Sequence, residues 1–212
     1  MKKIRVLLIP VGEEITPLLH GFRYVTEIDD VILIYSRETK KFAKQIEDRL
    51  LKMQLVRRVF KVECKAENLS NILKEITSKL KELYDISRIE IISNITGGTK
   101  IMALSCYMLS SIFNGSSFYI FKDGDVMKYI KVPTISSKLI EFLKESEIRI
   151  KILSYINENG IKLDDLSKLL GRSKSTIIYY LDKFTEFGLV EKLENKYKIT
   201  DLGKFMKALL LE

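Results

Sequence analysis

The segment at positions 94–100, with the sequence NITGGTK, combines residue types that could hold a phosphate group. Its two glycines let the backbone approach a ligand closely and adopt conformations that other residues avoid. An apolar run precedes the segment and a helical pattern follows it, so the unpaired N–H groups of the helix would face an anion. Thr96 and Thr99 add hydroxyl donors, and Lys100 adds a positive charge. The segment therefore predicts a cradle for a phosphate or a ribose.

A tight strand-to-helix turn would explain the same residues without a ligand. In that interpretation Thr99 is simply the N-cap residue of the following helix. The segment matches neither GxGxxG nor GxxxxGK[ST], so it indicates neither a dinucleotide site nor a P-loop.

The elements around this segment predict an α/β, Rossmann-like domain over residues 1–133. Apolar runs alternate four times with amphipathic stretches, which is typical of a mostly parallel sheet with helices on both faces. Asp123-Gly124 indicates a terminal β-hairpin. Ligands bind such sheets at the carboxyl ends of the strands, here the loops 10–16, 36–38 and 94–100. Strands are expected at 4–9, 31–35, 57–63, 88–93, 117–121 and 126–132, and helices at 15–24, 38–55, 68–84 and 99–113.

Residues 134–212 predict a second domain, an α+β winged helix-turn-helix with a C-terminal helix. Helices are expected at 147–158, 164–170, 173–187 and 202–211, and the two strands of a wing at 189–193 and 197–200. Leu169 and Ile178 are expected to face the core. The third helix would present its outer face to the major groove of DNA. The predicted DNA contacts are Arg172, Ser173, Lys174, Thr176, Tyr179, Tyr180, Lys183 and Lys196. A winged helix that mediates only protein contacts is the alternative.

The NITGGTK segment after the fourth strand resembles the signature of the CRISPR-associated Rossmann-fold (CARF) domains. A CARF domain followed by a winged helix resembles the archaeal CRISPR-associated transcriptional regulators of type I-A systems. The resemblance implies a homodimer whose two-fold axis carries a pocket for a cyclic oligoadenylate, most often cyclic tetra-adenylate. It assigns ligand contacts to Asn94, Thr96, Gly97, Gly98, Thr99 and Lys100, and to Pro10, Val11, Gly12 and Glu13 of the first loop. Ser36 and Arg37 would lie near the adenines.

These observations predict a cytoplasmic regulator that binds cyclic oligoadenylate and the promoter DNA of CRISPR-associated genes. Two alternatives remain: a ring nuclease that slowly cleaves cyclic tetra-adenylate with the help of Lys100, and a sensor of another phosphorylated metabolite. No metal or cofactor is expected, because His20 is the single histidine and Cys64 and Cys106 lie in apolar segments typical of buried thiols. The apolar runs are too short to span a membrane.

Net charge supports nucleic-acid binding only weakly. The chain carries a formal charge of +8, but residues 137–212 contain 14 basic and 12 acidic side chains. Most of the positive excess therefore lies outside the predicted DNA-binding domain, and the motif has to carry the prediction.

Overall fold

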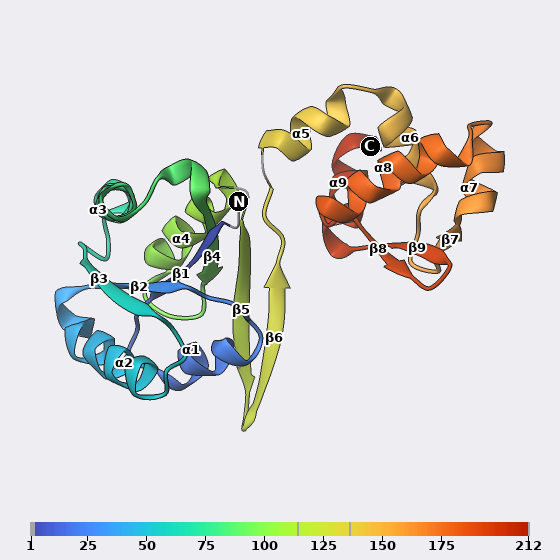
Figure 1. Cartoon of the computed structure of the whole chain (residues 1–212). Coiled ribbons are helices and arrows are strands. Elements are labelled where there is room, and N and C mark those ends of the chain that lie inside the picture. Colours follow the sequence, from blue (N-terminus) through green and yellow to red (C-terminus); the bar gives the residue numbers. More distant parts are fainter. Residues whose placement is uncertain (1–2, 114, 136, 212) are drawn as a thin grey trace. The chain divides into compact units, whose positions relative to one another are not determined.

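The computed structural model describes residues 3–113, 115–135 and 137–211. The chain divides into two compact units, Met1–Ser136 and Ser137–Glu212, called here the N-terminal and C-terminal units (Figure 1). Within the described residues, no helix has the length and apolar character needed to cross a membrane.

The N-terminal unit is built on a six-stranded sheet in the order β3-β2-β1-β4-β5-β6. Every neighbouring pair is parallel except β5 and β6, which form an antiparallel hairpin. Gly124 adopts a positive φ of 61° in the turn of this hairpin, as the Asp-Gly signal predicts. The strands are β1 (Ile4–Pro10), β2 (Asp30–Tyr35), β3 (Arg58–Glu63), β4 (Ile89–Asn94), β5 (Ser116–Asp123) and β6 (Val126–Val132).

Helices cover both faces of this sheet, as expected for parallel strands. On one face, side chains of β1 and β2 pack against α3 and α4. On the other face, the alternate side chains of the same strands pack against α1 and α2. The helices are α1 (Thr16–His20), α2 (Lys40–Lys52), α3 (Leu69–Leu83) and α4 (Lys100–Ile112), with short 3₁₀ turns η1 (Gly21–Arg23), η2 (Arg37–Thr39) and η3 (Ile86–Arg88).

A buried polar cluster joins β2, β3 and the end of α3 at the amino end of the sheet. The Asp30 carboxylate accepts hydrogen bonds from Arg58 Nε at 2.9 Å, from Arg58 Nη2 at 2.6 Å and from the Tyr84 hydroxyl at 2.6 Å. Asp30 is fully buried. Burial by itself raises its pKa, but the hydrogen bonds from Arg58 and Tyr84 and the Arg58 charge outweigh it, so the pKa lies below its ordinary value.

The C-terminal unit combines helices with a small antiparallel sheet in the order β7-β9-β8. Its core gathers side chains from every helix of the unit and from β8 and β9. Two elements, α5 and β7, are absent from the sequence-based expectation. The elements are α5 (Ser137–Lys144), α6 (Glu147–Tyr155), β7 (Ile161–Lys162), α7 (Leu163–Leu170), α8 (Lys174–Glu186), β8 (Val190–Leu193), β9 (Lys196–Ile199) and α9 (Asp201–Leu211).

The prediction that Leu169 and Ile178 face the core was wrong. Leu169 is 55% exposed and Ile178 is 37% exposed. The inward stripe of α8 runs through Ile177, Leu181 and Phe184, at spacings of four and three residues. Ile178 lies about 100° further around the helix and so faces solvent.

Candidate functional site

The side chain of Asn94 anchors the loop between β4 and α4 through hydrogen bonds. Asn94 is fully buried. Its amide Nδ2 donates to the Leu18 carbonyl at 3.2 Å, and its Oδ1 accepts from the N–H and the hydroxyl of Thr96 at 3.2 and 2.5 Å. Asn94 therefore fixes the start of the loop, and its side chain does not reach solvent.

The two threonine hydroxyls of the loop are also engaged within the protein. The Thr96 hydroxyl accepts from the N–H of Ile120 at 2.8 Å. The Thr99 hydroxyl donates to the Ala66 carbonyl at 2.9 Å and accepts from the N–H of Met102 at 3.3 Å. Thr99 is thus the N-cap of α4, as the turn interpretation predicts. Both hydroxyls position the loop, so a ligand would chiefly meet backbone N–H groups and Lys100 here.

Glycines 97 and 98 allow this loop to pack closely on the loop after β1. A Cβ at position 97 would lie 2.6 Å from the Pro10 carbonyl oxygen, and one at Gly98 would lie 2.9 Å from Pro10 Cβ. Gly98 also has a positive φ of 70°. A Cβ on Gly12 would lie 3.0 Å from the Gly98 nitrogen. One side of the glycine turn is therefore covered by the first loop, while Gly98, Thr99 and Lys100 are exposed on the other.

The first loop contributes backbone and acidic groups to this edge of the sheet. Pro10 and Val11 are buried, so their side chains pack the loop and do not face solvent. Glu13 is exposed, and Glu14 pairs with Lys122 at 2.6 Å.

A cavity of about 570 Å³ opens beside the glycine turn, at the carboxyl ends of β2 and β3. Ala66, the partner of Thr99, lies in its wall. Ser36 is only 6% exposed, with its hydroxyl 3.5 Å from that of Thr39, whereas Arg37 is exposed. Burial raises the pKa of Cys64, which also lines the cavity, to about 11, so its thiol is protonated at neutral pH. The other charged lining residues are Glu38, Glu63, Lys65, Glu67 and Glu75.

In the C-terminal unit, four of the predicted DNA contacts form two groups. The first group caps α8: the Ser173 hydroxyl accepts from the N–H of Thr176 at 3.3 Å and lies 2.8 Å from the Thr176 hydroxyl. The second group contains lysines with acidic neighbours. Lys174 pairs with Asp164 at 2.8 Å, and Lys183 pairs with Glu186 at 2.7 Å.

The remaining predicted contacts differ in exposure. Tyr179 is 56% exposed, and Arg172 and Lys196 are exposed. Tyr180 is half-buried near the Arg149 guanidinium, 5.8 Å from its ring centre. Ile178, which was expected to face the core, is exposed next to Tyr179 and adds an apolar side chain to this surface.

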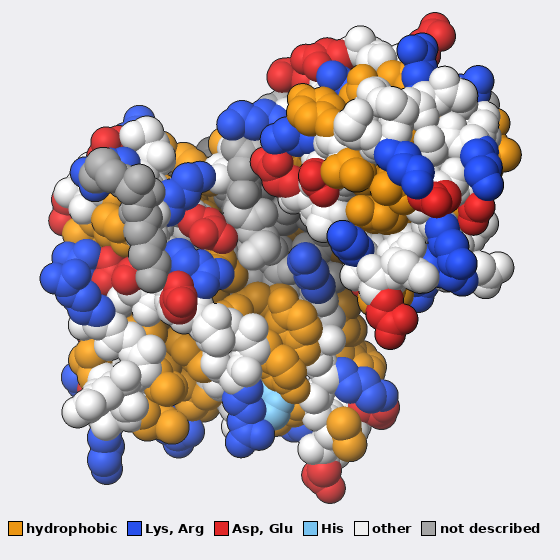
Figure 2. Space-filling view, turned by 45° about the vertical axis from the view of Figure 1, so that its right-hand side comes forward, with side chains coloured by type: hydrophobic (Ala, Val, Ile, Leu, Met, Phe, Trp, Pro, Cys, Tyr) orange, Lys and Arg blue, Asp and Glu red, His pale blue; other side chains and the backbone are white. Residues whose placement is uncertain are grey.

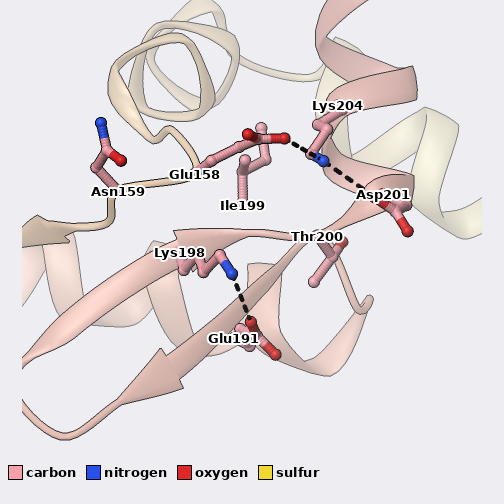
Figure 3. Close-up of a pocket in the computed structure, with 8 residues that line it drawn as sticks. All are labelled: Glu158, Asn159, Glu191, Lys198, Ile199, Thr200, Asp201 and Lys204. Atoms are coloured by element: carbon pink, nitrogen blue, oxygen red, sulfur yellow. Dashed lines mark ion pairs between the residues drawn. The ribbon is translucent and has the colours of Figure 1, made fainter.

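A second cavity of the C-terminal unit, about 530 Å³, is shown in Figure 3. Its charged side chains pair with one another: Lys204 bridges Glu158 and Asp201, and Lys198 lies 3.9 Å from Glu191. Because these charges already satisfy each other, this cavity offers a charged ligand little.

Comparison with known proteins gives two family matches. The model of the Card1 CARF domain matches residues 18–153, and the model of the N-terminal domain of the methanogenesis regulatory protein FilR1 matches residues 137–212. The first match contains the glycine turn but not β1. No match to a curated protein sequence was found.

Three solved structures are similar to this chain at low sequence identity. VC1899 from Vibrio cholerae is 14% identical with a TM-score of 0.49, over 96% of this chain and 64% of that one. Can2 from Sulfobacillus thermosulfidooxidans, in complex with cyclic tetra-adenylate, is 13% identical with a TM-score of 0.46, over 96% and 63%. Csm6 from Enterococcus italicus, bound to cyclic hexa-2'-fluoro-hexa-dAMP, is 12% identical with a TM-score of 0.49, over 99% and 54%. The chain thus spans between about half and two thirds of these proteins.

Proposed function

The chain belongs to the family of the Card1 CARF domain, and from that premise we propose that it is a CRISPR-associated transcriptional regulator. Its N-terminal unit would bind a cyclic oligoadenylate, with cyclic tetra-adenylate as the first candidate. Its C-terminal unit would be a winged helix-turn-helix that binds promoter DNA.

The exposed rim of the glycine turn carries the ligand proposal. α4 is 13 residues long, and its N-terminal end is open beside Gly98, Thr99 and Lys100. Backbone N–H groups, the helix dipole and one ammonium group together favour a phosphate at this point. Because buried Asn94 fixes the turn, these donors are held in place before the ligand arrives, which lowers the entropy cost of binding.

The adenines would occupy the neighbouring 570 Å³ cavity. Its carboxylates, including Glu38 and Glu63, repel phosphates but accept hydrogen bonds from an exocyclic amino group. Arg37 at the rim can stack on a base. In this proposed arrangement, the phosphates would lie at the glycine turn and the bases beside the carboxylates.

The outer face of α4 supports the homodimer. Leu104 is 46% exposed, and Ala103, Tyr107 and Met108 are half-buried on the same side of the helix. A second copy covering this apolar face would bring two glycine turns to one two-fold axis. A ring with an even number of nucleotides has a matching two-fold symmetry.

The arrangement of α7, α8 and the β8–β9 hairpin supports the DNA proposal. α7 and α8 are joined by a three-residue turn in which Gly171 has a positive φ of 61°. α8 then exposes Lys174, Ile178 and Tyr179 on one side. A helix after such a turn can enter the major groove, with the hairpin beside it.

Calorimetry with cyclic tetra-adenylate, combined with light scattering for the subunit number, tests the ligand proposal. We expect one ring per dimer, and at least a tenfold weaker affinity for Lys100→Ala because a charge-assisted contact to phosphate is lost. Lys81→Ala, on exposed α3 surface, is the matched control and should bind as the unaltered protein does. Absence of binding, or equal losses in both variants, would refute the proposal. Chromatography of the recovered ring would show linear products if Lys100 supports cleavage.

A further inference from the structure

The positive excess of the N-terminal unit comes from one segment of its sequence. Positions 37–65, which comprise η2, α2 and β3, contain ten Lys and Arg side chains and four Asp and Glu. The rest of residues 1–136 contains twelve of each sign. In Figure 2 hydrophobic side chains of this unit gather next to the one histidine of the chain, and Lys and Arg side chains occur at several places over the visible face.

The start of α2 forms a cationic cleft of about 410 Å³. Lys40, Lys41 and Lys44 project from its first two turns, and Lys61 faces them from β3. Two of these lysines have acidic neighbours: Lys61 pairs with Glu47, and Lys44 lies 3.7 Å from Asp48. Lys40 and Lys41 form no ion pair with any residue that the structure describes, and both are exposed.

The surface formed by Lys40, Lys41, Lys44 and Lys61 is called here the α2 face. We infer that the α2 face binds the phosphodiester backbone of a nucleic acid. Lysines are flexible point charges that suit phosphates without reading bases. The cations also continue along α2 to Lys52, which is exposed. Twelve residues of helix cover roughly 18 Å, which corresponds to about five phosphates along one strand at 3.4 Å each. This length exceeds what a single small phosphorylated metabolite would use.

The α2 face adjoins the proposed ring site, because Arg37 and Glu38 line both cavities, but its four lysines do not line the ring cavity. The ring site uses the glycine turn and a cavity rich in carboxylates, whereas the α2 face uses α2 and the adjoining edge of β3. It would give the N-terminal unit a sequence-independent nucleic-acid contact of its own, in addition to the proposed contact of α8.

The full-length triple variant Lys40→Gln/Lys41→Gln/Lys44→Gln tests the inference by fluorescence anisotropy between 50 and 200 mM salt. The probes are a 20-base-pair duplex DNA and a single-stranded RNA of equal length. Comparing their affinities shows which kind of nucleic acid the α2 face binds. We expect the slope of log K against log salt to shrink by about 2 to 3, since each lost phosphate contact removes about 0.7 to 0.9. The affinity at the lowest salt should fall at least about tenfold.

The control variant Lys74→Gln/Lys81→Gln/Lys131→Gln removes the same charge from α3 and β6, and should change the slope by less than about 0.5. Equal effects of the two triple variants would overturn the inference, because bulk charge alone would then explain the binding. A loss of cyclic tetra-adenylate affinity confined to the α2 variant would also overturn it, because the lysines would then serve the ring.

Lys174→Gln/Tyr179→Ala separates this inference from the proposed role of α8. If that variant binds duplex DNA as tightly as the unaltered protein while the α2 variant does not, the α8 proposal fails and the α2 face stands. If only the α8 variant loses affinity, the α2 face is refuted.

Discussion

The two units present their proposed contacts in opposite ways. In the N-terminal unit, the side chains nearest the proposed ligand are hydrogen-bonded inward, and the backbone of the glycine turn is left to meet the ligand. In the C-terminal unit, the side chains of α8 face solvent and the backbone is already bonded within the helix. Apart from those at exposed Lys100, substitutions near the glycine turn should therefore act through the position of the whole loop, whereas those on α8 should remove one contact each.

Gly97→Ala should produce the largest effect. The added Cβ would meet the Pro10 carbonyl at 2.6 Å and Leu18 Cδ2 at 2.9 Å, so the turn must move. A displacement of about 1 Å can cost on the order of 100-fold in a positioned site, and we expect that loss of cyclic tetra-adenylate affinity by calorimetry. Gly124→Ala is the control, because its Cβ meets nothing within 4 Å, although the positive φ there is also unfavourable. Unchanged affinity in Gly97→Ala would contradict the idea of a backbone site.

Asp30→Asn should lower the free energy of unfolding of the N-terminal unit by about 2 kcal/mol, since charge-assisted hydrogen bonds are worth roughly 1.5–3 kcal/mol. The folded-state pKa of Asp30 lies below 3.8, its ordinary value. The stabilisation is therefore present above about pH 4 and is lost as the pH falls through the folded-state pKa. Hydrogen exchange of the β2 amides, at pH 6 and at pH 3, measures the difference.

Hydrogen exchange gives the free energy of opening of β2 in Asp30→Asn and in the unaltered protein. The difference between these two free energies should be smaller at pH 3 than at pH 6. A difference that stays constant between the two pH values would show that the carboxylate charge is not what stabilises the cluster. The exposed ion pairs of the C-terminal unit should contribute much less to its pH dependence.

Tyr179→Ala should weaken duplex DNA binding by roughly tenfold, or about 1.4 kcal/mol, because an aromatic side chain on the proposed reading face is removed. Anisotropy with a promoter fragment measures the loss. Phe205→Ala removes a similarly exposed aromatic side chain from α9 of the same unit and should leave the affinity unchanged. If Phe205→Ala is the more damaging change, the DNA-binding face has been placed on the wrong helix.

Lys174→Gln should have the smallest effect, below about threefold in affinity. Its ammonium group pairs with Asp164 at 2.8 Å, so its charge is partly neutralised before DNA arrives. Asp164→Asn should conversely strengthen DNA binding by a similarly small factor, since it frees Lys174. An affinity loss of tenfold or more in Lys174→Gln would mean that Asp164 gives up the lysine to DNA.

Most of the N-terminal fold could be predicted because its apolar runs and amphipathic stretches alternate in a regular way. The expected strands and helices agree with the structure to within a few residues. β7 could not be predicted, because two residues carry no periodic pattern. α5 had a usable signal: Leu139, Phe142 and Leu143 have helical spacing and are buried.

The candidate site could be located from sequence, but the roles of its side chains could not. NITGGTK lies at the carboxyl end of β4, where an α/β sheet would bind a ligand. Thr96 and Thr99 are the types of residue that bind phosphates, yet their partners Ile120 and Ala66 are 24 and 33 positions away. Only the tertiary structure brings those partners close enough to engage the hydroxyls.

The close approach of Gly12 to the Gly98 nitrogen has a consequence for how this site can diversify. Because a methyl group on Gly12 would already press on the facing backbone at 3.0 Å, a change of shape in one loop requires a compensating change in the other. Altered ring specificity should therefore arise by paired replacements in the two segments. A directed-evolution library that varies residues 11–14 and 96–99 together should yield more functional variants than libraries that vary either segment alone.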